Sequence, residues 1–380
     1  METTNKQTTQ AEPNYGKQFN EEFTKIKKEV QKPNILIAGA TGVGKSSLIN
    51  HIFGKDVAVV GTGKPITQKI DVYESEDVDV RIFDSKGYEL GTQGDKDFYD
   101  NVINIAKVTN TPNNAIHLIW YCIASSSGRV QDYDLAAINA FSKSNVPVAV
   151  IFTKSDTPSE EEMTAMRACI PVVLQSSIFE TSVVNEEYDQ TEELILWSSA
   201  KLPEALQYAF IKSQVANLEE KWQQAHRLIK QHCVAAFATG FTPIPCSDAP
   251  ILVANEITLM ARILYLYGLG DIKDLISGSA VSSIIGSLLT SGGKALVGTL
   301  IKLIPGVGTA VGGLISGSVG AIITAAFGEA TSKVAYETAK AKLSGENTQG
   351  LMNNFGSQIM ELAKDYFKQG KKIDDYTLTE

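Results

Sequence analysis

The sequence predicts a doubly wound, mostly parallel α/β sheet in the first half of the chain and an all-α C-terminal domain in the second half. Three observations lead to this fold class. Apolar runs of strand length alternate with helix-like stretches, a glycine-rich loop joins one such run to the helix after it, and the residues that follow Pro203 favour helix. The predicted strands are Ile35–Ala38, Val78–Phe83, Ala115–Ile123 and Val146–Phe152. Most of them are continuously apolar, as expected for strands that are buried on both faces.

Composition and charge exclude several classes of protein. With 380 residues, of which 43% are hydrophobic and 20% charged, the chain is long enough for two globular domains and is not disordered throughout. Residues 1–203 hold 19 basic and 28 acidic side chains, whereas residues 204–380 hold 15 of each, so the first part carries the whole net charge of −9. Since neither part is basic, nucleic acid is not an expected partner.

The cysteines and the start of the chain predict a cytoplasmic protein. Cys122, Cys169, Cys233 and Cys246 form no C-x-x-C pair, so we interpret them as free thiols in a reducing compartment. Residues 1–14 are polar and predict a disordered tail without the apolar segment of a signal peptide.

Residues 15–33 predict an N-terminal amphipathic helix. Phe19, Phe23, Ile26 and Val30 recur at the spacing of one helix face. This apolar stripe either packs against a neighbouring helix or domain, or it binds a membrane or a partner.

The loop after the first predicted strand follows the pattern G-x-x-x-x-G-K-[ST], from Gly39 to Ser46. Its glycines allow successive N–H groups to point inward and to cradle phosphate oxygens at a helix N-terminus, whose dipole also favours anions. In such a loop Lys45 reaches the β- and γ-phosphates, and the Ser46 hydroxyl binds Mg²⁺. The predicted nucleotide-binding residues here are Gly39, Thr41, Gly42, Val43, Gly44, Lys45, Ser46 and Ser47. A chance match in a glycine-rich turn is the alternative, which the flanking strand and helix patterns disfavour.

A second motif, D-x-x-G, follows the predicted strand Val78–Phe83. Asp84 fits the carboxylate that holds Mg²⁺ through water, and Gly87 fits the backbone N–H that contacts the γ-phosphate. The pattern is common at strand ends, so its meaning comes from its place after the phosphate loop.

The segment Thr153-Lys154-Ser155-Asp156 follows the last predicted strand and has the pattern [NT]-K-x-D, which indicates guanine recognition. A carboxylate at Asp156 can accept hydrogen bonds from the N1 and N2 donors of guanine. Adenine presents an acceptor at N1 and lacks the N2 amine, so a site built for guanine rejects it. Thr153, Lys154 and Asp156 are therefore predicted to bind the base.

A short apolar run, Leu194–Trp197, leads into Ser199, Ala200 and Lys201. Because it comes after the other motifs, we expect these three residues to form a loop whose backbone contacts the guanine O6.

The second part of the chain is expected to be helical from Glu204 onward. Glu204–Cys233 contains no Gly or Pro and predicts one long connecting helix. Asp248 is a predicted N-cap for a helix over 249–267. Amphipathic helices are predicted over Glu329–Leu343 and Leu351–Phe367.

Two uncharged stretches, Leu275–Gly293 and Leu303–Gly328, are long enough to cross a membrane. The second has small residues at every fourth position, which let helices approach closely, a pattern enriched in membranes. Glycine is frequent in both stretches, and the first also has seven Ser or Thr residues, so a tightly packed soluble helical hairpin fits them equally well. Both alternatives stay open.

The motifs at Gly39–Ser47, Thr67, Asp84–Gly87 and Thr153–Asp156 together resemble a GTPase domain of the translation-factor class. Within that class, the sequence resembles the branch that includes Era-like, septin-like and immunity-related GTPases. The C-terminal half, especially Pro243–Gly268 and Ile304–Glu329, resembles the YcjF-like domain that follows GTPase domains in many predicted bacterial membrane-associated proteins. The resemblance implies a P-loop GTPase domain over 34–203 and a helical domain over 204–380.

The resemblance also implies roles for single residues. Thr67 corresponds to the switch threonine that meets Mg²⁺ and the attacking water, although Thr62 is close in sequence. The implied catalytic residues are Lys45, Thr67 and Gly87, and the implied Mg²⁺ ligands are Ser46, Thr67 and Asp84. Tyr88 stands where Ras-like enzymes carry a water-orienting glutamine, so intrinsic hydrolysis should be slow.

A dimer or a partner is then expected to complete the site. Arg129, in the loop after a core strand, is a candidate for donation in trans, against the simpler interpretation as a solvated arginine. Gly42 occupies the position of an asparagine in potassium-activated relatives, which disfavours that route to faster hydrolysis.

Three functions compete. The first is a GTP-hydrolysing switch, with Mg²⁺ as cofactor, that controls self-association or partner binding of a helical, membrane-associated domain. The second is a membrane-remodelling GTPase that resembles dynamin-like and immunity-related proteins, and the third is a GTP-binding scaffold that does not hydrolyse. The expected partners are GTP and GDP, a second copy of the chain, and the cytoplasmic membrane, to which the C-terminal domain would attach the protein peripherally or by insertion.

Overall fold

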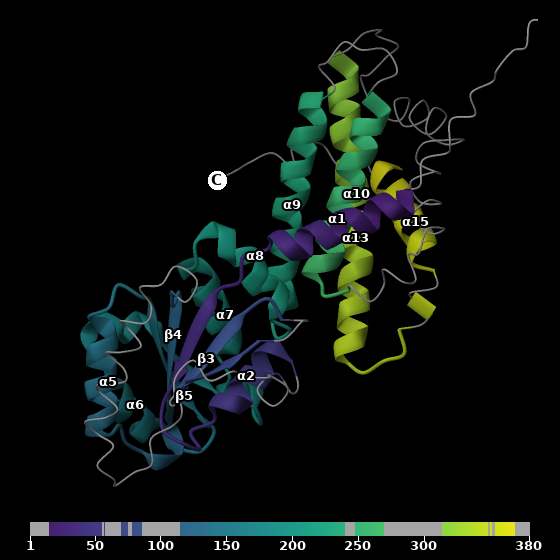
Figure 1. Cartoon of the computed structure of the whole chain (residues 1–380). Coiled ribbons are helices and arrows are strands. Elements are labelled where there is room, and N and C mark those ends of the chain that lie inside the picture. The colour runs from purple at the N-terminus through teal and green to yellow at the C-terminus, as the bar shows by residue number, and fades with distance from the viewer. Residues whose placement is uncertain are drawn as a thin grey trace, which may run out of the picture. The chain divides into compact units, whose positions relative to one another are not determined.

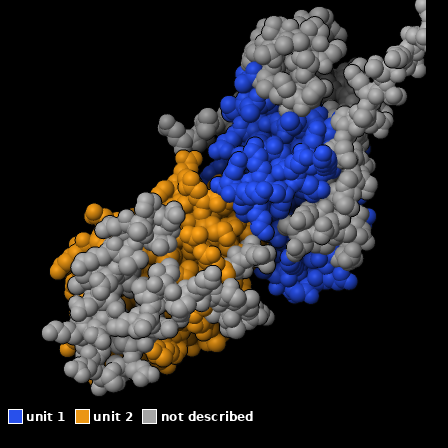
Figure 2. All heavy atoms as spheres, viewed as in Figure 1, with its two compact units in different colours: residues 1–29, 225–380 blue, residues 30–224 orange. Residues whose placement is uncertain are grey.

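The computed structural model describes residues 15–54, 57, 70–74, 78–85, 115–239, 248–269, 314–348, 350–351 and 354–368 (Figure 1). The chain divides into two compact units, which Figure 2 colours separately. We call residues 30–224 the sheet unit, and residues 1–29 with 225–380 the helical unit. Each unit is described by itself.

The sheet unit is built on a mostly parallel sheet. In the described residues it has six strands in the order β2-β3-β1-β4-β5-β6, and only β2 runs antiparallel to its neighbour. The strands are β1 (Asn34–Ala38), β2 (Ile70–Tyr73), β3 (Arg81–Ser85), β4 (Leu118–Ala124), β5 (Val148–Thr153) and β6 (Ile178–Thr181). The predicted doubly wound, mostly parallel sheet is therefore confirmed.

The strand order decides where a ligand can bind. β1 lies between β3 and β4, so the chain leaves it in one direction and later returns on its other side. Parallel strands end at a common edge, which we call the carboxyl edge, and the crevice beside such a reversal is the usual ligand site of this architecture. We call the opposite edge the amino edge.

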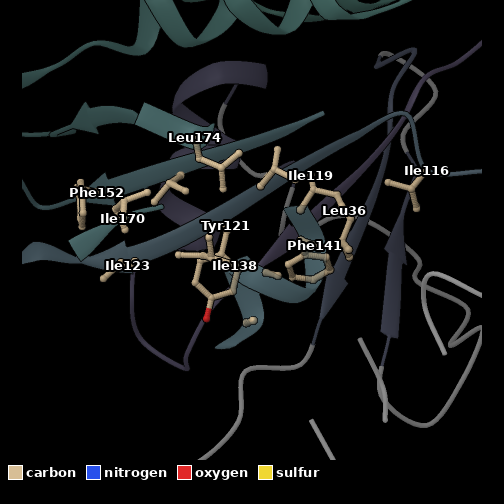
Figure 3. Close-up of a cluster of buried hydrophobic side chains, with 14 of the residues drawn as sticks. Leu36, Ile116, Ile119, Tyr121, Ile123, Ile138, Phe141, Phe152, Ile170 and Leu174 are labelled. Carbon is tan, nitrogen blue, oxygen red and sulfur yellow. The ribbon is translucent and has the colours of Figure 1, made fainter. Parts of the chain in front are cut away.

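Helices cover both faces of the sheet. On one face, α5 (Asp132–Ser142) and α6 (Glu160–Cys169) pack over the strands, and Figure 3 shows Tyr121 of β4 beside Ile138 and Phe141 of α5. Capping boxes start both helices. On the other face lie α2 (Lys45–Phe53), α7 (Thr191–Lys201) and α8 (Glu204–Ser213).

Adjacent side chains of β4 pack into the hydrophobic cores on opposite faces of the sheet. Tyr121 points to the α5 side, whereas the ring of Trp120 stacks on Phe53 of α2 at 6.0 Å between centroids. Phe210 of α8 meets both of these rings edge-on. Because successive strand residues point to opposite faces, a strand covered on both sides must be apolar throughout.

The short apolar run before the expected Ser199–Lys201 loop is part of a helix. Leu194–Trp197 lies inside α7, whose buried residues include Leu194, Ile195 and Ser198, at helical spacing. The strand in this part of the sheet is β6, sixteen residues earlier in the chain. A run of four apolar residues fits either structure, and only the packing against the sheet decides between them.

The predicted long helix over Glu204–Cys233 is interrupted. α8 ends at Ser213, and α9 (Leu218–Thr239) begins after four intervening residues. The Gln214 side chain donates to the carbonyl oxygen of Asn217 and accepts the backbone N–H of the same residue. The Asn217 side chain accepts the backbone N–H of Glu220 as an N-cap. Polar side chains that bond to nearby backbone in this way compete with helix continuation. α8 packs in the sheet unit, which extends to Gln224 and beyond the expected boundary at 203.

The helical unit contains α1 (Tyr15–Glu29), α9 from residue 225, α10 (Asp248–Leu266), α13 (Leu314–Leu343) and α15 (Phe355–Lys368). The helical C-terminal region that the sequence predicts is confirmed. α1 packs against α10, with the ring of Phe23 edge-on to Tyr265 at 5.5 Å. The apolar stripe of α1 is thus buried against a neighbouring helix, the first of its two predicted alternatives.

Small residues of α13 allow close packing. A Cβ on Gly328 would lie 2.8 Å from Ile229 of α9 and 3.0 Å from Leu259 of α10. A Cβ on Gly320 would lie 3.3 Å from the carbonyl oxygen of Ala236. This part of the glycine-rich stretch therefore packs within its own unit.

Most residues of the two stretches that could cross a membrane lie outside the described residues. Leu275–Gly293 and residues 303–313 lie there, as do the expected tail over 1–14 and Cys246. In the part of the chain that the structure describes, no helix has the length and apolar character needed to cross a bilayer.

Candidate nucleotide-binding site

The glycine-rich loop lies at the carboxyl edge between β1 and α2. Gly39 has φ 141° and follows β1, and Gly44 has φ 106° and precedes α2. A Cβ on Gly39 would lie 2.2 Å from the carbonyl oxygen of Cys122 on β4, closer than any real contact. The loop therefore needs glycine at this point both for its backbone angle and for its approach to the neighbouring strand.

Lys45 places a cation inside this loop. It is the first residue of α2 and is buried, and its Nζ donates to the carbonyl oxygens of Gly39 at 3.0 Å and Ala40 at 3.2 Å. Ser46 and Ser47 are exposed on the first turn of the same helix. A buried ammonium, hydroxyls and a helix N-terminus at one point form a site for an anion.

Asp84 lies close to the same point. It is the fourth residue of β3 and pairs with Ile37 of β1. Burial raises the pKa of the Cys122 thiol on β4 to about 12; the charge of Lys45 opposes this rise and that of Asp84 adds to it. Because Asp84 pairs with Ile37, two residues before Gly39, it lies beside the start of the glycine-rich loop. Thr67, Gly87 and Tyr88 lie outside the described residues.

The loop after β5 is fastened to the phosphate loop. The Thr153 hydroxyl donates to the carbonyl oxygen of Val43 and lies 3.3 Å from that of Ile123. The ammonium of Lys154 donates to the carbonyl oxygen of Gly42 at 3.0 Å. Lys154 has φ 59°, the only positive value outside glycine among the described residues. Such strained positions persist where the surrounding structure enforces them and gather at functional sites.

Asp156 is held by a residue that the sequence did not single out. The Ser182 hydroxyl donates to Oδ1 of Asp156 at 2.6 Å, and its oxygen accepts the backbone N–H groups of Val184 and Asn185. Ser182 follows β6 directly. The sequence signal that could have located this loop is weak, because β6 (Ile178–Thr181) has only four residues and one of them is charged. Asp156 itself is exposed and can reach a ligand.

Ser199, Ala200 and Lys201 do not form the expected loop. They make up the last turn of α7. Ser199 is buried, and its hydroxyl lies 3.4 Å from Glu220 at the start of α9. The loop that contacts Asp156 is instead the loop after β6, through the hydroxyl of Ser182.

An ion pair links α2 to the chain after β6. His51 Nε2 lies 3.0 Å from Oδ2 of Asp189, whose Oδ1 accepts the hydroxyl of Thr191 at the start of α7. The hydrogen bond with Asp189 raises the pKa of His51. Burial opposes ionisation of Asp189, but the hydrogen bonds from His51 and Thr191 outweigh it and lower the pKa of this carboxyl.

This pair should make stability depend on pH. The folded-state pKa of His51 lies above the ordinary 6.5, so its contribution is complete below 6.5 and is lost as pH rises through the raised pKa. The contribution of Asp189 is present above 3.8 and is lost as pH falls through its lowered pKa. Because His51 is partly exposed, we expect wild type to lose about 0.5 kcal/mol more than His51→Gln between pH 6 and pH 8.5. Urea unfolding at both pH values measures this, and equal losses in the two proteins would contradict it.

Ser182→Ala should weaken nucleotide binding without removing a predicted ligand. The substitution frees the Asp156 carboxylate to turn and leaves the N–H groups of Val184 and Asn185 without their acceptor, so we expect GDP affinity to fall about tenfold. Titration with fluorescent GDP measures it. The matched control is Ser142→Ala at the end of α5, whose hydroxyl bonds only locally to Asn139. Equal affinities in the two variants would show that Ser182 does not position Asp156.

The parallel sheet, the phosphate loop that opens into α2 and the fastened Thr153–Asp156 loop define the sheet unit as a GTP-binding P-loop GTPase domain. Residues 34–154 match the family model described as a 50S ribosome-binding GTPase.

Curated relatives agree with this class. The chain is 34% identical over 89 residues to magnetosome membrane protein 22 of Magnetospirillum gryphiswaldense, which covers 23% of this chain and 45% of that protein. It is 26% identical over 149 residues to a probable GTP-binding protein EngB of Mycoplasmopsis synoviae, covering 39% of this chain and 78% of the relative. It is 30% identical over 131 residues to a probable EngB of Caldanaerobacter subterraneus, covering 34% and 66%. The chain thus spans less than half of the magnetosome protein and about two thirds or more of the two EngB proteins.

Two solved structures are also similar. A probable GTP-binding protein engB has 20% identity and a TM-score of 0.32, and covers 42% of this chain and 94% of its own. The bacterial selenocysteine-specific elongation factor EF-Sec has 15% identity and a TM-score of 0.31, and covers 45% and 28%.

Proposed function

We propose that this protein hydrolyses GTP to GDP and phosphate and that the bound nucleotide controls self-association or partner binding of the helical unit. The observation that supports this proposal is that the Thr153–Asp156 loop is hydrogen-bonded to the phosphate loop. Thr153 and Lys154 bond to the carbonyls of Val43 and Gly42, so one loop for phosphate and one for a base are held in fixed relation. Two fixed loops of this kind suit a ligand that has both parts.

In this proposal the phosphate loop binds the β- and γ-phosphates through its backbone N–H groups and the Lys45 ammonium. Mg²⁺ would be held by Ser46, Thr67 and Asp84 and would neutralise charge on the phosphates. The oxygen ligands fit this ion, which usually takes one or two carboxylates together with phosphate oxygens.

Guanine would be bound by Asp156, which Ser182 orients. The backbone after β6, at Ser182 and Val183, would replace the expected Ser199–Lys201 as the contact to the guanine O6. Support comes from the Ser155 N–H, which donates to the carbonyl of Thr181 at 3.2 Å and holds the two loops together.

Hydrolysis would be slow in the isolated protein. Gly87 would contact the γ-phosphate through its N–H, and Tyr88 stands in place of a glutamine that orients water. We propose that assembly supplies the missing group. Arg129 is a candidate because its side chain is exposed while its carbonyl is held by the hydroxyl of Ser127 at 2.9 Å.

Membrane association is part of the proposal, with Leu275–Gly293 and residues 303–313 as the attachment, since α13 packs within its own unit from Gly320 onward. The similarity to a magnetosome membrane protein supports it. Ribosome binding, which the family description names, is less favoured because residues 1–203 carry the whole net charge of −9. A membrane-remodelling GTPase and a non-hydrolysing scaffold remain the competing functions, the second favoured by Tyr88.

The test is GTP hydrolysis over a range of protein concentrations, with and without liposomes, and with Lys45→Ala as the blank. A rate per molecule that rises with concentration or lipid supports a site completed by assembly. A flat, slow rate above the blank supports a switch that needs a separate activator. GTP that stays intact for hours would overturn hydrolysis and favour the scaffold.

A further inference from the structure

A buried charged cluster lies at the amino edge, away from the nucleotide loops. Its members, which we call the Asp79 cluster, are Lys32, Asp79, Lys212, Ser213 and Lys221. Asp79 is 1% exposed and lies two residues before β3, in the connection from β2. Its carboxylate is 3.0 Å from Nζ of Lys212 and 3.5 Å from Nζ of Lys32, and its N–H donates to the Ser213 hydroxyl at 2.7 Å.

The Asp79 cluster places several charged groups in the protein interior, where the loss of hydration is unfavourable. Lys212 and Lys221 are both buried, and the Lys221 ammonium donates to the carbonyl oxygen of Lys212 at 2.7 Å. Burial and the Lys212 charge lower the pKa of Lys221 to about 7. Buried ion pairs add little net stability compared with apolar packing, but removal of one partner is strongly destabilising because it leaves a buried charge uncompensated.

The groups joined here lie on both covalent connections between the units. Lys32 is in the segment between α1 of the helical unit and β1 of the sheet unit. Lys212 and Lys221 flank the break between α8 and α9, and α9 enters the helical unit at residue 225. One carboxylate therefore holds the sheet-unit ends of both connections.

Two rigid elements join this place to the nucleotide loops. β3 begins at Arg81, two residues after Asp79, and reaches Asp84 at the carboxyl edge, a span of about 16 Å for its five residues. α2 begins with Lys45, and near its end the carbonyl oxygen of Ile52 accepts the N–H of Val215, at 2.8 Å, from the α8–α9 break. A shift at either nucleotide loop would therefore move backbone that contacts the connections.

We infer that Asp79 is a positioning residue that couples the nucleotide in the sheet unit to the helical unit through both connections. This inference rests on the proposed nucleotide-dependent switch and names how its signal leaves the sheet. A shift of β3 between the GTP and GDP states would carry Asp79 with it, and Lys32 and Lys212 would follow.

Amide hydrogen exchange on the full chain tests the inference. Exchange in α1 and in residues 225–239 is compared between GDP and a GTP analogue with an imido bridge between its β- and γ-phosphates. We expect the two states of wild type to differ about threefold or more in these segments, and Asp79→Asn to remove most of that difference while both nucleotides still bind within about threefold of wild type. Glu74→Gln is the matched control, because Glu74 lies in the same β2–β3 connection but is exposed and pairs with Arg81.

A second variant protects the test against misfolding. Asp79→Asn leaves the Lys212 ammonium buried beside a neutral group, so Asp79→Asn with Lys212→Met removes both charges together. A full nucleotide-dependent difference in either folded variant overturns the coupling and leaves the proposed switch standing. Loss of nucleotide affinity in both variants, but not in Glu74→Gln, also overturns it, because Asp79 would then support the nucleotide site itself. If wild type shows no difference between nucleotides, the proposed switch fails first and the inference with it.

Discussion

Asp156→Asn is expected to change the preferred base from guanine to xanthine. In the proposed complex the Asp156 carboxylate would accept from both N1 and N2 of guanine, whereas an amide at this position would bring its own donor against the N2 amine. Xanthine has a carbonyl in place of that amine, so the amide donates to it and still accepts from N1. Because a buried mismatch of hydrogen-bonding groups discriminates strongly, we expect the ratio of GDP to XDP affinity to change about a thousandfold.

Competition between GDP and XDP in one sample of the variant measures this ratio, which does not depend on how much of the protein is folded. Ser182 can still donate to the amide oxygen, so the side chain should keep its place. The matched control, Asp189→Asn, removes a carboxylate from the chain after β6 without changing the group that faces the base. If Asp156→Asn keeps the wild-type preference for GDP, guanine is not bound by this side chain.

Gly39→Ala is expected to have the largest effect on stability. The new Cβ would lie 2.2 Å from the carbonyl oxygen of Cys122, and φ at this position is 141°. The contact is with backbone in the middle of the sheet, which cannot turn aside as a flexible side chain can. Backbone strain and overpacking each cost about 1–3 kcal/mol, so a loss of about 3 kcal/mol or more in the free energy of unfolding is expected, together with loss of nucleotide binding.

Urea unfolding followed by tryptophan fluorescence measures the loss, since Trp120 lies inside the sheet. Gly54→Ala separates the two causes: φ there is also positive, at 101°, but no atom lies within 4 Å of the added Cβ. It should lose only the part due to backbone strain. Equal losses in both variants would mean that the approach of the phosphate loop to β4 carries no cost.

The helical unit combines helices from before and after the sheet unit in sequence. α1 comes before the sheet unit in sequence, yet it packs on α10 in the helical unit. The sheet unit therefore has two connections to the helical unit. In the proposed switch, a nucleotide signal would act on both. This is why the Asp79 cluster, which holds a residue of each connection, is a more informative target for mutation than either connection alone.

The sequence by itself determined the features that depend on neighbouring residues. The strands β1, β4 and β5 are apolar runs between glycine-rich or polar loops, and their loops carry the phosphate and guanine motifs within a few residues. Backbone angles, such as those of Gly39 and Gly44, are properties of single positions and can be recognised from residue type. These local signals sufficed for the class of the sheet unit and for most of its candidate ligands.

The tertiary structure alone decided what depends on contacts between distant residues. The apolar run Leu194–Trp197 became part of α7 because its helical face packs on the sheet, and the four-residue β6 took the edge position instead. Ser182 lies 26 residues from Asp156, and Asp79 lies 133 residues from Lys212. Neither pair has a sequence pattern, because each is created by strand order and helix packing, whose energy comes from many residues at once.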